Sequence, residues 1–418
     1  MERSTAEKRQ VTYRDVFHNG NWIRLWTGQT ISQLGDAVSD IAFPLLVYEI
    51  TKSPVGLGLG FGVEMLPLIV IGPIAGVFVD HWNRRTLLLV ADFVRIGCAL
   101  GMFLSTSVWQ LYVLALLAAI MQAIFLATYS ATIPQITQEQ FTKSISLSYM
   151  GYKTMQVIGP MLAAIIIGLA GGPRAAFLFD TATFTVGFLL TLTISVANVE
   201  RQDPAKNFLQ DLGVGLSFLW QNAALRYIAS YHVVFIIVSA ASALGTVLYI
   251  KLSLGLSATL SDQLYGITGV VLAGSMAFMA WLIGLLDERI SKRTLMLYAP
   301  VVAGLAYLLF LLHPGPTWIL PIFFVVSVGN ACGLLSFQTL LAHSIPNHLR
   351  GRVYSFFNAI GSVANLAAYG LFAALGLLLS PATLLALAGM ILLIGIPLCT
   401  LVFKGNQALR AQEASENT

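Results

Sequence analysis

The stretch that decides the fold is GVFVDHWNRR, residues 76–85, where an apolar run ends in an aspartate and two adjacent arginines follow. The chain becomes apolar again at once, with TLLLVA at residues 86–91. Such a short polar interruption between two long apolar runs is typical of a loop that returns the chain to a membrane.

The composition of the whole chain points to the same environment. Hydrophobic residues make up 57% of the chain and charged residues only 10%, and the mean hydropathy is +0.79. A soluble domain has about 25% charged residues, so this chain carries too little charge to cover a surface exposed to water. We therefore expect an all-α, multi-pass membrane protein.

Apolar runs bounded by glycine, proline or charged residues predict twelve membrane-spanning helices in two groups of six. Each run is long enough for the roughly 20 residues that a spanning helix needs. The predicted spans are 24–49, 56–79, 86–105, 109–133, 144–170 and 175–197, followed by 224–250, 261–286, 294–313, 317–342, 353–378 and 382–403.

These spans divide the chain into two six-helix bundles, over residues 24–197 and 224–403. An N-terminal tail (1–23), a linker (198–223) and a C-terminal tail (404–418) complete the predicted domains. All three are expected to be cytoplasmic.

The linker between the two bundles carries leucines at helical spacing beside polar residues. These are Leu209, Leu212, Leu216 and Leu219. The spacing predicts an amphipathic helix on the cytoplasmic face of the membrane. An ordinary solvated linker is the alternative.

The distribution of positive charge predicts the orientation. Eighteen of the 23 Lys and Arg residues fall on the side of the N-terminus, three (Lys52, Arg174 and Lys251) on the other side, and two (Arg95 and Lys153) within spans. Loops rich in Lys and Arg remain in the cytoplasm. Both termini are therefore expected there, in a bacterial inner (plasma) membrane, and the net charge of +4 needs no nucleic-acid partner to explain it.

The opening stretch recurs as GLLDERISKRTLML at residues 284–297. The pairs at a constant offset of 208 are Gly76 and Gly284, Asp80 and Glu288, Arg84 and Lys292, and Arg85 and Arg293. A second echo pairs TIPQI (132–136) with SIPNH (344–348). The chain is thus predicted to consist of two parallel six-helix repeats, an architecture of secondary transporters that bind their substrate between the repeats.

The pattern Gly76-x-x-x-Asp80-x-x-Asn83-Arg84-Arg85 resembles the loop signature between the second and third spans of the major facilitator superfamily. The resemblance implies that the glycine permits close helix packing, and that the acid and the basic pair hold the two halves together on the cytoplasmic side. The cytoplasmic gate residues implied are Gly76, Asp80, Arg84, Arg85, Glu288 and Arg293. Asn83 stands where the family has glycine, and we expect it to adopt a left-handed backbone.

Further stretches resemble the branch of that superfamily which contains the enterobactin exporters and macrolide-efflux proteins. They are GQTISQLGD (28–36), ADFVRIG (91–97), VIGPMLAA (157–164), FLFDTATF (177–184) and IPNHLRGRVYS (345–355). Gly159-Pro160 also resembles the superfamily's antiporter motif, which implies export. Ala163 and Ala164 replace the later glycines of that motif.

The ionisable residues expected at depth in the membrane all belong to the first half. They are Asp36, Asp40, Glu64, Asp92, Arg95, Lys153 and Asp180. Each needs a reason to be there, because a charged side chain within the membrane costs ~2.5–3.5 kcal/mol. The second half has no acid or base at mid-membrane apart from His232, and is expected to supply much of an apolar substrate wall.

One group of these residues forms a polar stripe on the first span, because its members are spaced by four, three and four residues. The stripe is Gln29, Gln33, Asp36 and Asp40. Since a polar stripe must face protein or water, the first span is expected to line the central cavity.

The candidate residues for proton coupling or substrate binding are Gln29, Gln33, Asp36, Asp40, Glu64 and Lys153. The alternative for the charged residues is structural ion pairing, of Lys153 with an acid and of Asp92 with Arg95. Asp92, Arg95 and Asp180 are expected to be mainly structural. The aromatic residues Trp281, Tyr249, Tyr265, Phe337, Phe356 and Phe357 would either stack on a bulky ligand or pack in the protein.

These observations predict a secondary active efflux transporter, acting as a proton-coupled antiporter for bulky amphipathic compounds of the macrolide or multidrug type. The sequence has no Gly-x-x-x-x-Gly-Lys-Ser/Thr loop, so the energy would come from a proton gradient. We expect no enzyme activity, no cofactor and no metal site. A siderophore exporter and, less favoured, an importer are the alternatives.

The expected partners are a small-molecule substrate, protons and the lipid bilayer, without nucleic acid, and the protein is expected to act as a monomer. A membrane-embedded enzyme or receptor would need a reactive group of residues or a large soluble domain. The sequence offers neither, and Cys98, Cys332 and Cys399 each stand alone in an apolar run.

The predicted topology can be tested by cysteine labelling in intact cells. A cysteine that replaces Ser53 or Thr317 should react with a membrane-impermeant maleimide added outside, because both positions lie in predicted outer loops. A cysteine at Asn83 or Asn347 should stay unlabelled until the membrane is permeabilised. The opposite pattern would refute the orientation and the direction of export.

Overall fold

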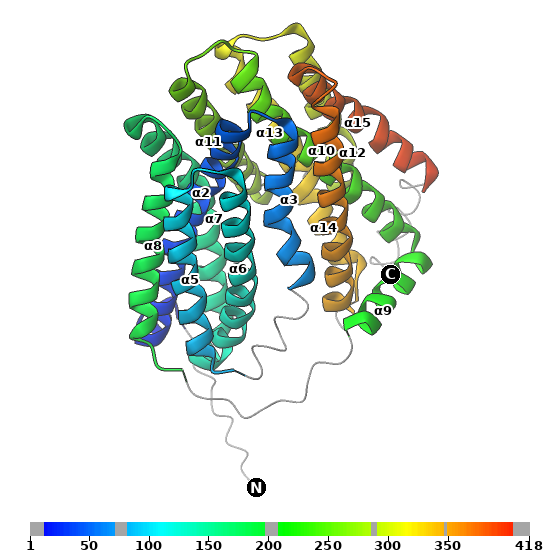
Figure 1. Ribbon diagram of the computed structural model, residues 1–418. Coiled ribbons are helices and arrows are strands. Elements are labelled where there is room, and N and C mark those ends of the chain that lie inside the picture. Colours follow the sequence, from blue (N-terminus) through cyan, green and yellow to red (C-terminus); the bar gives the residue numbers. More distant parts are fainter. Residues whose placement is uncertain (1–11, 72–81, 197–207, 286–290, 347–348, 404–418) are drawn as a thin grey trace.

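The computed structural model describes residues 12–71, 82–196, 208–285, 291–346 and 349–403 (Figure 1). These residues form helices and turns without a strand, so the prediction of an all-α membrane protein is confirmed. Nine helical stretches of the described chain are long and apolar enough to cross a membrane. The count of twelve spans and the domain boundaries stay predictions.

Within the described ranges, six long helices precede the linker helix and six follow it. The first bundle contains α2 (Gly20–Thr51), α3 (Pro54–Val70), α5 (Arg84–Leu104), α6 (Val108–Thr137), α7 (Phe141–Ala170) and α8 (Arg174–Leu192). The second bundle contains α10 (Ala223–Leu252), α11 (Ala258–Leu285), α12 (Lys292–Leu308), α13 (Pro316–Ser344), α14 (Arg350–Leu375) and α15 (Pro381–Val402). The short elements are α1 (Tyr13–Phe17), η1 (Gln138–Gln140), α9 (Phe208–Gln221) and η2 (Leu309–Leu312).

Side-chain caps explain where the two helices after the repeated loop begin. The Asn83 side chain accepts a hydrogen bond from the Thr86 amide at 3.1 Å and starts α5. At the offset of 208, the Ser291 hydroxyl accepts one from the Thr294 amide at 3.4 Å and starts α12. Each cap satisfies an amide that has no partner within its helix.

This geometry corrects the expectation for Asn83. Its backbone is extended, at φ −64° and ψ 119°, and not left-handed. Asn83 therefore acts here through its side chain, which caps α5. Its ability to adopt a left-handed backbone is not used.

The linker helix α9 lies over Phe208–Gln221 and packs against α14. Of the leucines that predicted an amphipathic helix, Leu219 is buried and Leu216 is exposed. The helix therefore agrees with the predicted position, although the side chains of Leu209 and Leu212 lie outside the described part of the chain.

Within the first bundle, α2 is the central helix, packing against α7 and α8, while α5 packs against α6 and α8. Gly159 of α7 allows a close approach to α2, since a Cβ atom there would overlap the Ala37 methyl group of α2. In the second bundle, α12 packs against α13 and α15, and α10 against α15 and α14.

The two bundles meet mainly along two helix pairs, α3 with α14 and α7 with α11. Figure 1 shows α3 and α14 side by side. The Phe61 and Tyr369 rings stack across the first pair, with their centroids 4.8 Å apart. Small residues bring the backbones together, and a Cβ atom at Gly58 would overlap the methyl group of Ala373.

These contacts lie in the half of each helix that is farther from α1 and the start of α2. In the second pair, Gly266 of α11 faces Ala164 of α7, and Gly269 faces Pro160. Together with Gly58 and Tyr369, these residues hold the bundles together at the end opposite to α1.

The role of this contact can be tested by comparing two glycines near the α3–α14 pair. Gly58→Ala should weaken the closed end by about 1–3 kcal/mol, because the added methyl group overpacks the contact with Ala373. Gly370→Ala is the matched control, since nothing lies within 4 Å of its Cβ position.

The measurement is a spin–spin distance between labels at Thr106 and Leu378, which lie in or next to loops at the closed end. Gly58→Ala should increase the population with a long distance, and Gly370→Ala should leave it unchanged. Equal distance distributions in the two variants would show that this contact does not control closure.

Candidate functional site

A cavity of about 260 Å³ lies inside the first bundle, and most of the ionisable residues of the predicted spans gather around it. Its ionisable lining residues are Asp36 and Asp40 from α2, Glu64 from α3, Arg95 from α5 and Asp180 from α8. We call it the acid cavity. Four carboxyl groups and one guanidinium thus meet within an apolar bundle.

Arg95 is the centre of the charged network. Its Nη2 atom lies 2.6 Å from Asp36 Oδ1, a short charge-assisted hydrogen bond between α5 and α2. The predicted pair with Asp92 is also present, but Nη1 lies 3.9 Å from Asp92 Oδ1, which is too long for a hydrogen bond. The guanidinium carbon lies 3.9 Å from the ring centroid of Phe184, an additional cation–π contact with α8.

Asp180 connects α8 to α2 by hydrogen bonds, and it forms no ion pair with any described residue. The Ser39 hydroxyl donates to Asp180 Oδ2 at 2.7 Å, and the Thr183 hydroxyl donates to the Asp180 backbone carbonyl at 2.8 Å. The Asp180 side chain is almost fully buried. It is therefore held in place on the wall of the cavity.

Asp40 and Glu64 differ from the other acids of the cavity. Among the described residues neither has a hydrogen bond or an ion pair, and each lines the cavity directly. The two carboxyl groups interact electrostatically with each other, so that two charged forms repel. Both also lie within electrostatic range of Tyr265 of the second bundle.

The two glutamines of the predicted polar stripe do not share the position of its two aspartates. Gln29 is 4% exposed and packed in the protein, whereas Asp36 and Asp40 are open to the cavity. The first span was expected to line the central cavity. The acid cavity that it lines is walled by α2, α3, α5, α6 and α8, all from the first bundle. Gln33 does not line it.

The position of Lys153 differs from the alternative of a structural ion pair with an acid. The described part of the chain shows no ion pair between Lys153 and an acid; its Nζ atom donates to Gln156 Oε1 at 3.2 Å. The ammonium group also lies 5.6 Å and 5.3 Å from the ring centroids of Tyr149 and Tyr152. Lys153 is therefore separate from the acid cavity.

Sequence reasoning placed Arg95 and Asp180 among structural residues, yet both line the same cavity as the candidate acids. The sequence signal that could have identified them as cavity residues is a charged side chain within an apolar run. It could not show that α5 and α8 turn these side chains toward the cavity that the acids of α2 and α3 also line.

A second charged pair was also missed. Lys251, which had been assigned to an outer loop, lies near the end of α10 and forms an ion pair with the buried Asp262 of α11. This pair belongs to the second bundle and lies near the closed end.

The predicted gate is only partly described. Gly76, Asp80 and Glu288 lie outside the described residues. Arg84 donates to the backbone carbonyl of Ala131 at 2.6 Å, and Arg85 to that of Leu192 at 2.5 Å. Both arginines thus hold the start of α5 against the ends of α6 and α8.

The antiporter-type pair Gly159-Pro160 is buried in α7. Gly159 faces α2, and Pro160 faces Gly269 of α11. The pair therefore lies where the first bundle meets both its own central helix and the second bundle.

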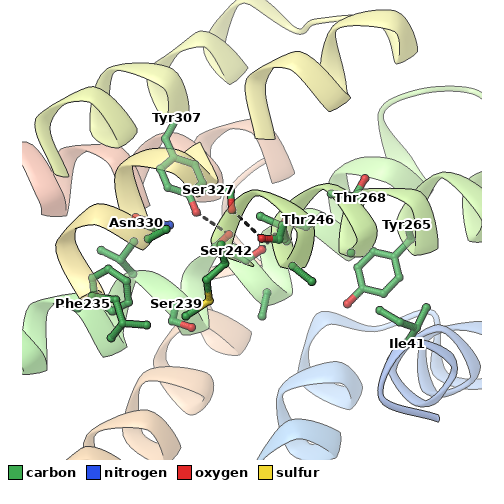
Figure 2. A pocket seen from close by; sticks show the side chains of 18 residues that line it. Ile41, Phe235, Ser239, Ser242, Thr246, Tyr265, Thr268, Tyr307, Ser327 and Asn330 are labelled. Carbon is green, nitrogen blue, oxygen red and sulfur yellow. Dashed lines mark hydrogen bonds between the residues drawn. The ribbon is translucent and has the colours of Figure 1, made fainter. Parts of the chain in front are cut away.

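A second cavity, of about 370 Å³, lies in the second bundle (Figure 2). Its lining comes from α10, α11, α12 and α13, with Ile41 of α2 as the contribution from the first bundle. None of the described residues that line it is Asp, Glu, Lys, Arg or His. We call it the neutral cavity. Among the described residues, no group of three or more His, Cys, Asp or Glu could hold a metal ion.

The aromatic residues of the second half are mostly packing residues. Phe337, Phe356, Phe357 and Tyr249 are buried, and Phe337 stacks on His232 with ring centroids 4.7 Å apart. Tyr265 is the member of the predicted aromatic set that lines the neutral cavity.

The comparisons with known proteins agree on one family. A family model described as Major Facilitator Superfamily matches residues 25–369. The "Uncharacterized MFS-type transporter YfiS" of Bacillus subtilis is 24% identical over 82% of this chain and 83% of its own. The "Multidrug efflux pump Tap" of Mycobacterium tuberculosis is 26% identical over 79% of this chain and 81% of its own.

The "Macrolide efflux protein A" of Streptococcus pyogenes is 23% identical, but the match covers only 48% of this chain and 51% of that protein. Among solved structures, a peptide transporter POT in complex with alafosfalin has a TM-score of 0.70 at 12% identity, covering 93% of this chain and 95% of that one. A bacterial homologue of the lysosomal transporter Spinster, described as inward-facing and unoccupied, has a TM-score of 0.69 at 12% identity, covering 94% and 97%. At these identities the structures are similar in fold alone.

The charged network predicts that Arg95 and Asp36 contribute unequally to stability. Arg95→Leu should lower the free energy of unfolding by about 3–5 kcal/mol, because it leaves buried carboxylates without their counter-ion. Asp36→Asn should cost less, since Arg95 keeps Asp92 and the Phe184 ring as partners.

Thermal unfolding of the purified variants in detergent measures this difference. Glu139→Gln, at an exposed position in η1, serves as the control for loss of a charge. Equal melting temperatures for Arg95→Leu and Asp36→Asn would contradict the assignment of Arg95 as the centre of the network.

Proposed function

This chain belongs to the Major Facilitator Superfamily, and from that premise we propose that it is a proton-driven efflux transporter for amphipathic small molecules. Proteins of this family are transporters, so the chain is a multi-pass membrane transporter of a small molecule and not an enzyme. The direction of transport, the coupling ion and the substrate class are the proposed parts.

The observation that carries proton coupling is the pair Asp40 and Glu64. Both carboxyl groups face the acid cavity without a basic partner among the described residues, and they repel each other when both are charged. A proton on either acid removes that repulsion and the cost of a charge within the membrane. The pair is therefore suited to bind a proton on one side and release it on the other.

Arg95 connects the protonation of the acid cavity to the position of the helices. It is the counter-ion of Asp36, and Asp40 interacts electrostatically with both residues. Protonation of Asp40 would remove one negative charge from the environment of Arg95. The helices that carry these groups, α2 and α5, would then be free to shift relative to each other, which links proton binding to helix movement.

Export is supported by the closed end of the molecule. The contacts of α3 with α14 and of α7 with α11 lie away from the N-terminus, as do Gly58 and Gly266. If the N-terminus is cytoplasmic, as the charge distribution predicts, this conformation is closed to the outside and suited to load substrate from the cell. Alternating access would open these contacts and close the cytoplasmic gate.

The gate assignment is part of the same proposal. Arg84, Arg85 and Arg293 begin α5 and α12 at the end nearest the N-terminus. With Gly76, Asp80 and Glu288 of the intervening loops, they would latch the bundles together in the outward-open state. Gly159 and Pro160 would form the flexible contact of α7 with α2 and α11.

The substrate class comes from the relatives by analogy. Two relatives are named as a macrolide efflux protein and a multidrug efflux pump. Bulky amphipathic drugs are the corresponding proposal for this chain, with a proton gradient in place of any cofactor. We place the protein in a bacterial plasma membrane with both termini in the cytoplasm, acting as a monomer.

Siderophore export is the second candidate, because the branch that residues 28–36 and 177–184 resemble contains the enterobactin exporters as well as macrolide-efflux proteins. Uptake of a macrolide and of enterobactin into everted vesicles distinguishes the two. The same vesicles distinguish export from import, because an exporter accumulates its substrate in them.

Neutral substitutions of the two unpaired acids test proton coupling. Asp40→Asn and Glu64→Gln should each abolish accumulation against a gradient and leave some downhill movement, because the substituted side chain cannot release a proton. The measurement uses proteoliposomes with an imposed pH gradient and compares accumulation with simple equilibration.

Glu49→Gln, at an exposed position on α2, is the matched control and should transport like the unchanged protein. If both acid variants still accumulate substrate uphill, neither acid is essential for coupling. Asp36 and Lys153 would then be the next positions to substitute, with Gln29 and Gln33 as possible substrate contacts.

A further inference from the structure

The neutral cavity carries polar groups that the fold itself does not use. Four of its hydroxyls are satisfied within the protein: Tyr307 donates to Ser242 Oγ at 2.7 Å, Thr246 to the Ser242 carbonyl, Thr268 to the Leu264 carbonyl and Ser327 to the Leu272 carbonyl. Others remain available. Figure 2 shows Ser239, Tyr265 and Asn330 around the same space.

The available groups have a defined hydrogen-bonding capacity. Among the described residues, the hydroxyls of Ser239 and Tyr265 have no hydrogen-bond partner. Asn330 bonds to Tyr307 through its side chain, but its Oδ1 atom is buried and unpaired. A ligand in this cavity would therefore meet two hydroxyl donors and one amide acceptor.

The rest of the wall is apolar. Phe235, Leu272, Met276 and Leu334 line the cavity together with Ile41. The methionine can adapt its shape to different ligands. A volume of about 370 Å³ lies within the range of roughly 300–1,000 Å³ for small-molecule sites.

The charge of the wall excludes one class of ligand. A permanent cation or anion would lose its hydration shell in the neutral cavity and would gain no opposite charge from the residues that line it. A neutral ligand has no such cost. If it carries a carbonyl or ether oxygen, it can accept from Ser239 and Tyr265, and if it carries a hydroxyl or amide hydrogen, it can donate to Asn330.

We infer that the neutral cavity is a substrate site for uncharged amphipathic compounds that carry both hydrogen-bond acceptors and donors. The site lies within the second bundle, apart from the acids. This inference rests on the transport function proposed above and names the chemical class that the transporter takes.

Tyr265 gives the two cavities a physical link. Its hydroxyl belongs to the wall of the neutral cavity, and it also interacts electrostatically with Asp40 and Glu64 of the acid cavity. A ligand that accepts a hydrogen bond from Tyr265 reorients this hydroxyl. The charge state of the two acids and the occupancy of the neutral cavity therefore affect the same group.

The test is equilibrium binding of labelled probes to the purified full-length protein in detergent. Chloramphenicol and cortisol are the neutral probes, since both carry hydroxyl and carbonyl groups, and tetraphenylphosphonium is a cation without hydrogen-bonding groups. The unchanged protein should bind at least one neutral probe. Asn330→Leu and Ser239→Ala should each raise the Kd of that probe about five- to tenfold, as expected for loss of one hydrogen bond.

Two control variants carry their substitutions on the same helices as Asn330 and Ser239. Thr339→Val on α13 and Ser230→Ala on α10 each remove a hydroxyl that bonds to its own helix outside the cavity. They should bind the neutral probe like the unchanged protein. Ser239→Ala removes a hydroxyl that no described group uses, so its effect does not depend on misfolding, and any binding of the cation should be unaffected.

A second measurement locates the ligand. In a chain whose native cysteines are replaced, Ser239→Cys should react with a neutral maleimide, and the bound neutral probe should slow this reaction. Failure of the unchanged protein to bind either neutral probe overturns the inference. So do an unchanged Kd in both cavity variants and a lack of protection at position 239.

These outcomes are separate from those that test proton coupling. Binding in detergent needs no gradient, so a protein that is not coupled to protons can still bind the neutral probes. A coupled transporter that binds only the cation would retain the proposed function and lose this inference.

Discussion

The ion pair between Arg95 and Asp36 is the interaction on which the first bundle depends. A guanidinium placed within an apolar helix bundle must be neutralised locally, because lipid and apolar side chains cannot solvate it. Here the neutralising groups come from α2 and α5, and the Phe184 ring of α8 covers the guanidinium. Three helices are thereby held in one register around the acid cavity, which fixes where Asp40 and Glu64 can lie.

The two bundles share a helix arrangement but differ in their chemistry. The acid cavity of the first bundle concentrates carboxyl groups, while the neutral cavity of the second is lined by hydroxyls, an amide and apolar side chains. In the proposed mechanism, such a division would separate proton handling from ligand binding, which require opposite environments. A carboxyl group that exchanges protons must be allowed to carry charge, whereas a neutral ligand is bound best where no charge competes for its polar atoms.

Coupling between the two cavities then depends on the contact between the bundles. Small residues such as Gly58 and Gly266 let the backbones approach closely. Because these residues have no side chain beyond the backbone, few side chains must change conformation when the helices separate. Tyr265, at the boundary, lines the neutral cavity and interacts electrostatically with Asp40 and Glu64 of the acid cavity. In the proposed mechanism, a change of charge in the acid cavity would alter the packing that holds the bundles closed.

The sequence by itself determined the class of the protein, its long apolar helices and its family. Hydropathy and charge are properties of local segments, and the repeat at residues 76–85 and 284–297 could be read without knowing any contact. The same local reasoning selected Asp36, Asp40 and Glu64, because an acid within an apolar run is unusual wherever it occurs. It also identified the pair of Asp92 with Arg95, which is spaced at one helical turn.

Only the tertiary structure decided which of these groups meet. Asp36 and Arg95 are distant in the sequence, and their ion pair depends on how α2 and α5 are rotated about their axes. The rotations of α8 and α7 likewise bring Asp180 to the acid cavity and keep Lys153 away from it, and no local pattern encodes them. The neutral cavity was equally hidden, since Ser239, Tyr265 and Asn330 are ordinary residues that become a site when three helices turn them toward one space.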